Sequence, residues 1–442
     1  MIKNYIRIKS DTKNLNIRIE INTNMEDLIS FLNHWWREGK VKKSLALPYK
    51  RRYFNELQDL MKYRQIIIIC GLRRVGKSTL MYQLIQYLID RGVSPYNILY
   101  FSFDKGSLEI KKILDIYSKL TDVDYENENI FVFLDEIYKL KNWYDELKLL
   151  YDALPNVKFV ISGSASLQIE EKARKNLTGR YFFVEIKPLN FNEFFELKFG
   201  KKIEKPEVWA NKLKATFPIF MKRAFPEIID WEEERAKEYV KELIIDKILF
   251  SDFQKVLKDA DADLLQNLTE IFLSSPGMYL NLDSLSRDLG KSKNTLISHI
   301  KMLEFGYIIR LVKNYRGSML SVSRKLKRVY PYHPSLITGI FREVGEENLA
   351  ECFIRSYLDA ELYWRKGNKE VDFVYRDKPI EIKYKDKISK EDIKGLLSFM
   401  RKFGVNKGYL ISRDVEDIIK INRKEIEVIP IWKLAIRNFN LR

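Results

Sequence analysis

The stretch IIIICGLRRVGKSTLMYQLI, from Ile66 to Ile85, decides the fold of the N-terminal half of the chain. Its β-branched run, Ile66 to Ile69, predicts a buried parallel strand, and Thr79 to Leu88 repeats apolar residues at helical spacing. The loop between them fits the pattern G-x-x-x-x-G-K-[ST] at every fixed position. Strand, loop and helix in this order predict a loop that binds phosphate.

The residue types in this loop supply different contacts to a nucleotide. Glycines let the backbone turn tightly, and N–H groups at the helix start donate to phosphate oxygens. We expect Lys77 to reach the β- and γ-phosphates and the hydroxyl of Ser78 to bind Mg²⁺, so ATP and Mg²⁺ are the predicted cofactors. The predicted nucleotide-binding residues of the loop are Gly71, Leu72, Arg73, Arg74, Val75, Gly76, Lys77, Ser78 and Thr79.

A second motif, IFVFLDEIYKL, is an apolar run that ends in Asp135 and Glu136. If its strand is a parallel neighbour of the first, both carboxylates lie beside the phosphate loop, because ligands gather at the carboxyl ends of parallel strands. We expect Asp135 to bind the nucleotide-bound Mg²⁺ through a water, and Glu136 to be the general base.

Two further segments hold candidates for the same site. The strand VKFVISGSAS ends in hydroxyl residues, and Ser162 or Ser164 is the expected γ-phosphate sensor, although a turn rich in Ser and Gly needs no such role. Arg180 is the expected arginine finger, acting within its own chain or from a neighbouring subunit, and a surface arginine at a turn is the alternative. The predicted catalytic residues of ATP hydrolysis are therefore Lys77, Glu136 and Arg180.

Four segments together resemble a known family: CGLRRVGKSTL, FVFLDEIYKLKNWYDELKLLYD, NVKFVISGSAS and LTGRYFFVEIKPLNFNEFFEL. In order and spacing they resemble a largely archaeal and bacterial family of AAA-like P-loop ATPases related to the STAND class of signalling proteins. The resemblance, which covers residues 50–435, implies an α/β core with a parallel sheet flanked by helices, a helical lid, a winged helix and a restriction-endonuclease-like C-terminal domain. The Gly-Gly-aromatic-Pro-Glu element of the family reads Arg223-Ala224-Phe225-Pro226-Glu227 here.

The chain divides accordingly into five predicted parts. These are an N-terminal extension (1–50), a P-loop ATPase core (51–190), a helical lid (191–264), a winged helix (265–335) and a PD-(D/E)xK nuclease-like α/β domain (336–442).

The net charge of +17 is concentrated in two windows. Ser286 to Tyr330 has eleven basic and two acidic residues, and Arg37 to Arg64 has nine basic and three acidic residues. Such clusters favour a polyanionic partner, because basic groups release counterions from phosphates; a solvated lysine-rich surface is the alternative. No run approaches the ~18 apolar residues of a membrane span, so we expect a cytoplasmic protein with no membrane partner. Two distant cysteines predict no disulfide framework.

The predicted winged helix reads as helix, short helix, helix and β-hairpin. We expect wing strands at Tyr307 to Leu311 and Met319 to Val322, with Arg316 and Gly317 at their turn. The local positive charge favours DNA as the partner, whereas a protein-docking or spacer role is the alternative. The predicted DNA-binding residues are Lys291, Lys293, Asn294, Ser298, Lys301 and Arg316.

The C-terminal part contains VDFVYRDKPIEIKY, in which Asp372, Glu381 and Lys383 follow the pattern D-x8-E-x-K. Glu381 and Lys383 are two apart on a strand and so share a face, and a hairpin would bring Asp372 beside them. Asp372 and Glu381 are the predicted metal ligands and Lys383 the predicted catalytic lysine. The pattern resembles the PD-(D/E)xK nuclease core, which implies that Glu351 takes its helical acidic position, with Glu370 nearby. Alternating charge on an exposed strand is the other interpretation, and cleavage stays open.

These observations predict an Mg²⁺-dependent ATPase coupled to a DNA-binding winged helix and a nuclease-like domain. The alternative is a slow ATP-dependent regulatory switch with an inactive nuclease-like domain. A homo-oligomer or a protein partner is compatible with both.

Overall fold

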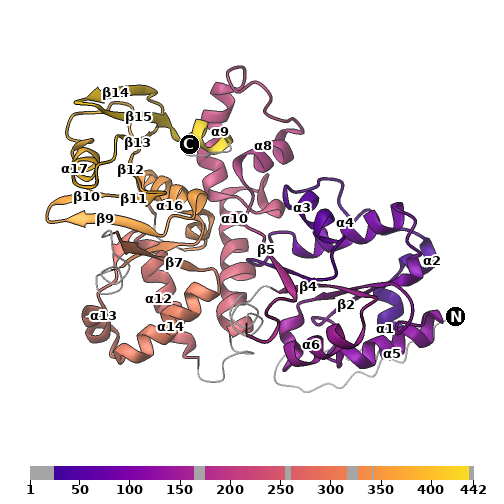
Figure 1. Cartoon of the computed structure of the whole chain (residues 1–442). Helices are drawn as coiled ribbons and strands as arrows, with labels where there is room; N and C mark the ends of the chain where they lie inside the picture. Colours follow the sequence, from indigo (N-terminus) through magenta and orange to yellow (C-terminus); the bar gives the residue numbers. More distant parts are fainter. Residues whose placement is uncertain (1–23, 164–174, 254–259, 316–326, 341–342, 438–442) are drawn as a thin grey trace.

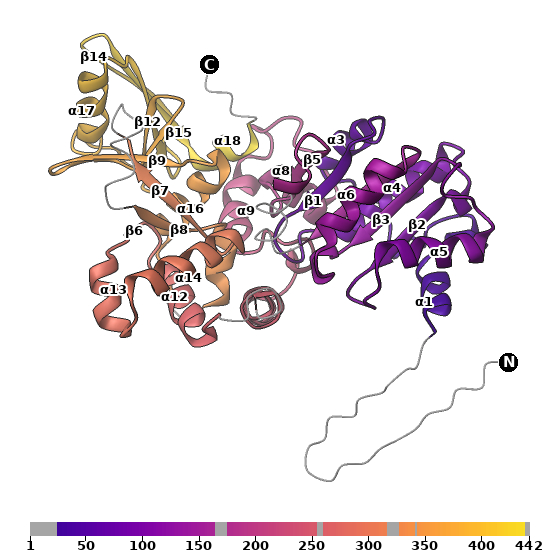
Figure 2. The same ribbon diagram turned by 60° about the horizontal axis from the view of Figure 1, so that its bottom comes forward.

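The computed structural model describes residues 24–163, 175–253, 260–315, 327–340 and 343–437. One sheet, with its helices, lies on the right of Figure 1, and two further sheets lie on the left. Helices α8 and α9 lie between them, as Figure 2 also shows. Within the described ranges, no helix has the length and apolar character needed to cross a membrane.

The first sheet is parallel throughout, with the strand order β2-β3-β4-β1-β5. Its strands are Ile66–Cys70 (β1), Ile98–Ser102 (β2), Ile130–Asp135 (β3), Val157–Gly163 (β4) and Tyr181–Glu185 (β5). The helices of this part are Lys77–Asp90 (α4), Ile110–Thr121 (α5) and Trp143–Ala153 (α6), with short 3₁₀ turns at Pro95–Asn97 (η1) and Ile137–Lys139 (η2). Strand β1 is fully buried, as a central strand covered by helices must be. The predicted α/β P-loop core is confirmed.

Three short helices precede this sheet: Met25–Leu32 (α1), Trp35–Glu38 (α2) and Tyr53–Leu60 (α3). The indole N–H groups of Trp35 and Trp36 both donate to the carbonyl of Ile98, at 3.1 and 2.9 Å. The side chain of Asn33 pairs with both backbone groups of Tyr100. Because β2 is an edge strand, these contacts satisfy backbone groups that would otherwise face solvent. The described residues before position 50 thus pack on the core.

In its described residues, the segment after the first sheet contains helices and no strand, as the sequence predicts. It contains Phe191–Phe199 (α8), Ala210–Lys222 (α9), Pro226–Ile228 (η3), Glu233–Glu238 (α10) and two π-helical segments, Tyr239–Ile245 (η4) and Ile248–Asp252 (η5). Asn190 and Glu193 form a reciprocal capping box that fixes the start of α8. π-Helical turns are rare and often mark functional positions, so η5 is relevant to the site described below.

The three helices predicted between residues 265 and 305 are present as Ala262–Ser274 (α12), Leu282–Leu289 (α13) and Lys293–Phe305 (α14), with β6 at Met278–Tyr279. Strand β7 (Ile309–Asn314) pairs with β8 (Arg328–Pro331). The predicted second wing strand, Met319 to Val322, and Arg316 lie outside the described residues. Strand β7 also pairs with β9, so the sheet β10-β9-β7-β8-β6 continues into the C-terminal part.

The C-terminal part is mixed α/β. It contains Pro334–Gly339 (η6), Glu346–Leu358 (α16), Leu362–Lys366 (β9), Lys369–Val371 (β10), Phe373–Tyr375 (β11), Lys378–Lys383 (β12), Lys394–Phe403 (α17), Lys407–Ser412 (β13), Asp417–Ile421 (β14), Lys424–Pro430 (β15) and Ile431–Ile436 (α18). The third sheet has the order β11-β12-β13-β15-β14. The single strand expected at VDFVY is two strands, because the chain leaves the second sheet after β10 and enters the third at β11. Asp372 is the residue at this change of sheets.

Candidate functional site

The glycine-rich loop connects β1 to α4 at the carboxyl end of the first sheet. Gly71 has a φ of +147°, and a Cβ atom there would overlap the carbonyl oxygen of Ile186, so only glycine fits. Gly76 has a φ of +94° and precedes α4. The side chains of Leu72 and Val75 are buried in the core, which leaves only their backbone available to a ligand. The loop therefore presents backbone at the start of α4, where Thr79 lies in the first turn.

The ammonium group of Lys77 lies over this loop. Its side chain is 5% exposed, and Nζ donates to the carbonyl oxygens of Gly71 at 3.1 Å and Leu72 at 2.8 Å. These bonds hold a fixed positive charge at the mouth of β1, where a phosphate would bind.

Ser78 and Asp135 are in direct contact. The hydroxyl of Ser78 donates to Oδ2 of Asp135 at 2.6 Å, and the hydroxyl of Tyr100 donates to the same oxygen at 2.8 Å. The hydroxyl of Ser162 donates to Oδ1. Strand β4 lies between β1 and β3, so these two strands are not neighbours. Ser162 is on β4 and contacts Asp135 from this intervening strand. A hydroxyl and a buried carboxylate are hard oxygen ligands, so this donor set fits Mg²⁺.

Glu136 follows Asp135 in a left-handed backbone conformation, with a φ of +56°. Its N–H donates to the hydroxyl of Ser162 at 3.2 Å, which holds the turn in place. Burial and the charge of Asp135 raise the pKa of Glu136, while the charges of Lys77 and Arg73 oppose this rise. A non-glycine residue in this conformation is strained, and such strain concentrates at functional positions.

Two predicted residues of the ATP site remain to be placed, Ser164 and Arg180. Ser164 lies outside the described residues. Arg180 precedes β5, and the register that pairs Ile66 with Tyr181 puts it at the amino end of the sheet, opposite the loop. Its guanidinium pairs with Asp152 at 2.8 Å. The expectation that Arg180 reaches a γ-phosphate in its own chain is therefore wrong, because a parallel strand separates the two edges; action on a neighbouring subunit stays a prediction.

Sequence reasoning missed Arg51, which contacts both the loop and the lid. Its side chain is 6% exposed, and Nη1 donates to the carbonyls of Val75 at 2.7 Å and Lys187 at 2.9 Å. Nη2 lies 2.8 Å from the carboxylate of Glu193, the capping residue of α8. Its only sequence signal was its place in a basic window, which we interpreted as favouring a polyanionic partner, with a solvated surface as the alternative.

The two arginines of the loop also have partners in the helical segment. Arg73 pairs with Asp252 of η5 at 2.7 Å, and the hydroxyl of Tyr138 donates to the same carboxylate oxygen at 3.1 Å. Arg74 pairs with Glu227 at 3.3 Å, in the element that departs from the family pattern. Both side chains of the loop thus face the helices that follow the core.

The predicted nuclease-like residues lie together at the change of sheets. Oδ2 of Asp372 accepts a bond from the backbone N–H of Ile382 at 2.8 Å, and Nζ of Lys383 lies 2.9 Å from Oε1 of Glu381. Burial and the charge of Asp372 raise the pKa of both Glu381 and Glu351. The acidic groups therefore gather as the pattern predicts.

An arginine occupies this acidic cluster. Arg328 lies 2.7 Å from Glu351, 3.3 Å from Glu370 and 3.6 Å from Asp372. Among the residues that the structure describes, no three acidic, histidine or cysteine side chains are placed to hold a metal ion. The predicted metal site of Asp372 and Glu381 does not fit this arrangement.

The predicted DNA-binding side chains of α14 and of Lys291, just before it, are partly engaged in contacts within the chain. Lys293 pairs with Asp283, and Lys291 pairs with Asp261 at 2.7 Å. The hydroxyl of Ser298 donates to a carbonyl of its own helix. Asn294 and Lys301 are exposed on the same helix.

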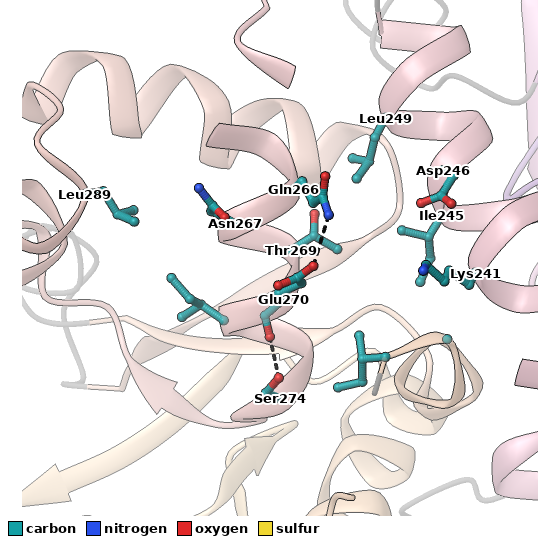
Figure 3. Close-up of a pocket in the computed structure, with 13 residues that line it drawn as sticks. Lys241, Ile245, Asp246, Leu249, Gln266, Asn267, Thr269, Glu270, Ser274 and Leu289 are labelled. Carbon is teal, nitrogen blue, oxygen red and sulfur yellow. Dashed lines mark hydrogen bonds between the residues drawn. The ribbon is translucent and has the colours of Figure 1, made fainter. Parts of the chain in front are cut away.

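A separate cavity of about 360 Å³ lies away from the phosphate loop, between η4, α12 and η6. Figure 3 shows Lys241 and Asp246 on one wall and Gln266 and Glu270 on another. The amide of Gln266 donates to the carboxylate of Glu270 at 3.1 Å, within one wall. The cavity marks a loosely packed junction between the lid and α12.

Comparisons with known proteins agree with the core assignment. Residues 63–195, which span the whole first sheet, match the model of the AAA domain family, so this part of the chain is similar to that family. Residues 224–343 and 347–434 match two domains of unknown function, DUF8612 and DUF4143. These two matches assign no activity to the rest of the chain.

The similar whole chains are uncharacterized proteins. One from Methanocaldococcus jannaschii is 27% identical over 77% of this chain and 76% of its own length, and a second from that organism is 26% identical over 90% and 95%. One from Haemophilus influenzae is 26% identical over 59% and 66%.

Two solved structures also align over much of the chain. They are Cdc6p of Pyrobaculum aerophilum (13% identity, TM-score 0.30, 67% of this chain and 96% of that chain) and the ADP form of ORC2 of Aeropyrum pernix (11%, 0.34, 68% and 93%). At these scores the likeness carries no inference about function.

Proposed function

We propose that this chain binds ATP with Mg²⁺ and hydrolyses it. The observation that supports this most strongly is the 2.6 Å contact between the hydroxyl of Ser78 and Oδ2 of Asp135, directly beside Lys77. Two motifs separated by 57 positions thus converge at one end of the sheet. A loop of exposed backbone, a fixed ammonium group and a buried acidic pair are the parts that phosphoryl transfer needs.

Each side chain has a distinct role in this proposal. Ser78 and Asp135 would hold Mg²⁺, which when bound neutralises phosphate charge. Lys77 exchanges its bonds to the loop carbonyls for bonds to phosphate oxygens. Glu136 accepts a proton from the attacking water, and its raised pKa makes it a stronger base than an ordinary carboxylate.

We further propose that the nucleotide state is transmitted to the lid and to the region that follows. Arg73, Arg74 and Arg51 connect the loop to Asp252, Glu227 and Glu193 of the helical segment. The hydroxyl of Tyr307, which precedes β7, lies 3.6 Å from Sγ of Cys70 at the end of β1. A change in the loop would therefore act on several elements at once.

Duplex DNA is the proposed partner of the winged-helix-like region. Its support is the exposed face of α14, where Asn294 and Lys301 are available and the surrounding window is basic. A slow ATP-dependent switch with an inactive nuclease-like domain is the second candidate, and the position of Arg328 among the carboxylates favours this view of the C-terminal part.

ATP turnover with and without duplex DNA separates the two candidates. For a DNA-coupled ATPase we expect DNA to stimulate turnover, Glu136→Gln to abolish it, and Lys301→Glu to weaken only the stimulation. Lys420→Glu is the matched control, because Lys420 is an exposed lysine on β14, far from α14. A slow rate that DNA leaves unchanged supports the switch, and unchanged turnover in Glu136→Gln contradicts the ATPase site itself.

A further inference from the structure

Arg328 extends from β8 of the second sheet into the acidic cluster of the C-terminal part. Its Nη2 lies 2.7 Å from Oε1 of Glu351 on α16. Its Nη1 lies 3.3 Å from Oε1 of Glu370 on β10 and 3.6 Å from Oδ1 of Asp372. One guanidinium therefore contacts a carboxylate of α16 and two carboxylates at the end of β10, and its side chain is 10% exposed.

Several neighbouring groups contact the side chain of Arg328. Nε donates to the carbonyl of Gly277 at 2.8 Å, and a Cβ atom at Gly277 would lie 2.6 Å from Nη2. The guanidinium lies over the rings of Tyr279 and Tyr330 at 5.9 and 5.1 Å. Both hydroxyls donate to carboxylates that Arg328 contacts, Tyr330 to Glu351 at 2.6 Å and Tyr279 to Glu370 at 2.8 Å. Nε and Nη2 are thus held by direct contacts, whereas Nη1 makes ion-pair contacts with Glu370 and Asp372 but no hydrogen bond to the described residues.

The positive charge of Arg328 in this cluster is permanent. A guanidinium does not lose its proton in a protein, so Arg328 offsets part of the negative charge of these carboxylates at every accessible pH. A divalent cation would need the oxygens that Arg328 now contacts, chiefly those of Glu351 and Asp372. Two positive groups in this buried space would repel each other strongly, so the arginine and a metal ion exclude one another.

A second observation shows that the cluster still has an unused acceptor. Glu381 is 9% exposed, and its buried Oε2 has no hydrogen-bond partner among the described residues. Oδ2 of Asp372 accepts a bond from the N–H of Ile382, the residue after Glu381, so the two acids lie close together. An unpaired buried carboxylate oxygen costs free energy unless a cation or a donor meets it. Oε1 of the same carboxylate pairs with Lys383, so Oε2 is the acceptor that stays open in this cluster.

We propose that Arg328 is an internal cation that occupies the place of a divalent metal ion and keeps this acidic cluster closed to metal. Metal binding then requires Arg328 to withdraw, which means a shift of β8 relative to α16. Strand β8 belongs to the same sheet as β7, and Tyr307, two residues before β7, contacts Cys70 at the end of β1, so the ATPase core has a route by which to move β8. This last step rests on the proposed ATPase function, whereas the exclusion of metal does not.

Mn²⁺ titration of the full-length chain without nucleotide, by calorimetry, tests the exclusion. We expect the Arg328→Gln variant to bind one Mn²⁺ ion more than the wild type, or to bind Mn²⁺ at least about tenfold more tightly. The double variant Arg328→Gln/Asp372→Asn should lose this gain. Arg328→Lys keeps the positive charge and is expected to behave as wild type. Arg310→Gln is the control, because Arg310 on β7 lies near Glu185 instead of the cluster.

Thermal unfolding gives a readout that does not depend on activity. Mn²⁺ should raise the melting temperature of Arg328→Gln but not that of wild type or of the double variant. If Arg328→Gln does not fold, the single variant Asp372→Asn tests the proposal instead. We expect Asp372→Asn to bind Mn²⁺ as the wild type does. A wild-type Mn²⁺ site that Asp372→Asn removes, or an Arg328→Gln variant that folds and gains no Mn²⁺, overturns the proposal. ATP turnover of the same variants reports separately on the ATPase site.

Discussion

The hydroxyl of Ser78 lies 2.6 Å from Oδ2 of Asp135, although the strands that lead to these residues are not neighbours. Strand β4 separates β1 from β3, and Ser162 on β4 contacts the other oxygen of Asp135. The loop and Asp135 are therefore joined through hydroxyl groups, which fixes their relative positions.

Glu136→Gln should remove hydrolysis and keep nucleotide binding. The amide has nearly the same shape as the carboxylate but cannot accept the proton of the attacking water, so we expect the turnover number to fall by about 10²–10⁴-fold. Steady-state phosphate release measures turnover, and calorimetric titration measures binding. Equal loss of binding and turnover would show that Glu136 positions the nucleotide instead.

The rate of ATP hydrolysis should fall on the acid side, with a midpoint above pH 4.5. Burial and Asp135 raise the pKa of Glu136 above that ordinary value. A general base works only when deprotonated, so the rate falls as the pH drops through the raised pKa. Turnover between pH 5 and 8 at saturating ATP measures this limb. A rate that stays flat down to the pH at which the chain unfolds would contradict the assignment.

Arg51→Ala should destabilise the junction between the loop and α8. The substitution leaves the buried carboxylate of Glu193 without its charged partner, which costs about 3–5 kcal/mol. Urea unfolding of this part of the chain measures the loss. Arg52→Ala is the matched control, because Arg52 is an exposed neighbour whose side chain bonds to Tyr53. Similar losses in both variants would show that the effect is not specific to the Arg51 contacts.

Arg73 and Asp252 should show a measurable coupling. The carboxylate of Asp252 is 1% exposed and lies 2.7 Å from Arg73, so either single change leaves a poorly compensated charge. We expect Arg73→Gln/Asp252→Asn to cost less than the sum of the two single variants by about 0.5–3 kcal/mol. A double-mutant cycle in urea measures this term. Strict additivity would mean that the pair does not link the loop to η5.

The phosphate loop and the acidic pair were predictable from the sequence because each depends on a short run of neighbouring residues. Gly71, Lys77 and Ser78 lie within one turn and one loop, and Asp135 ends an apolar strand. The convergence of these motifs follows from a general property of parallel sheets. The strand order was not predictable, because neither motif carries information about which strand lies between them.

Contacts between segments that are far apart in the sequence could not be predicted from the sequence. Arg51 and Arg328 were both counted within basic windows, yet both are buried against carboxylates far away in the sequence. Charge alone cannot distinguish a surface arginine from one that reaches a buried acid, because the difference lies in tertiary packing. Arg180 was misplaced for a related reason: the residue before a strand lies at the amino edge, and sequence proximity to a family motif does not reveal this.

Calorimetric titration of ATP with Mg²⁺ into the full-length chain tests the central claim most directly. We expect the wild type to bind one nucleotide per chain, Lys77→Ala to bind it at least about tenfold more weakly, and the surface control Lys420→Ala to match the wild type. A folded wild type that takes up no nucleotide, or a Lys77→Ala variant with unchanged affinity, would contradict a nucleotide site at this loop.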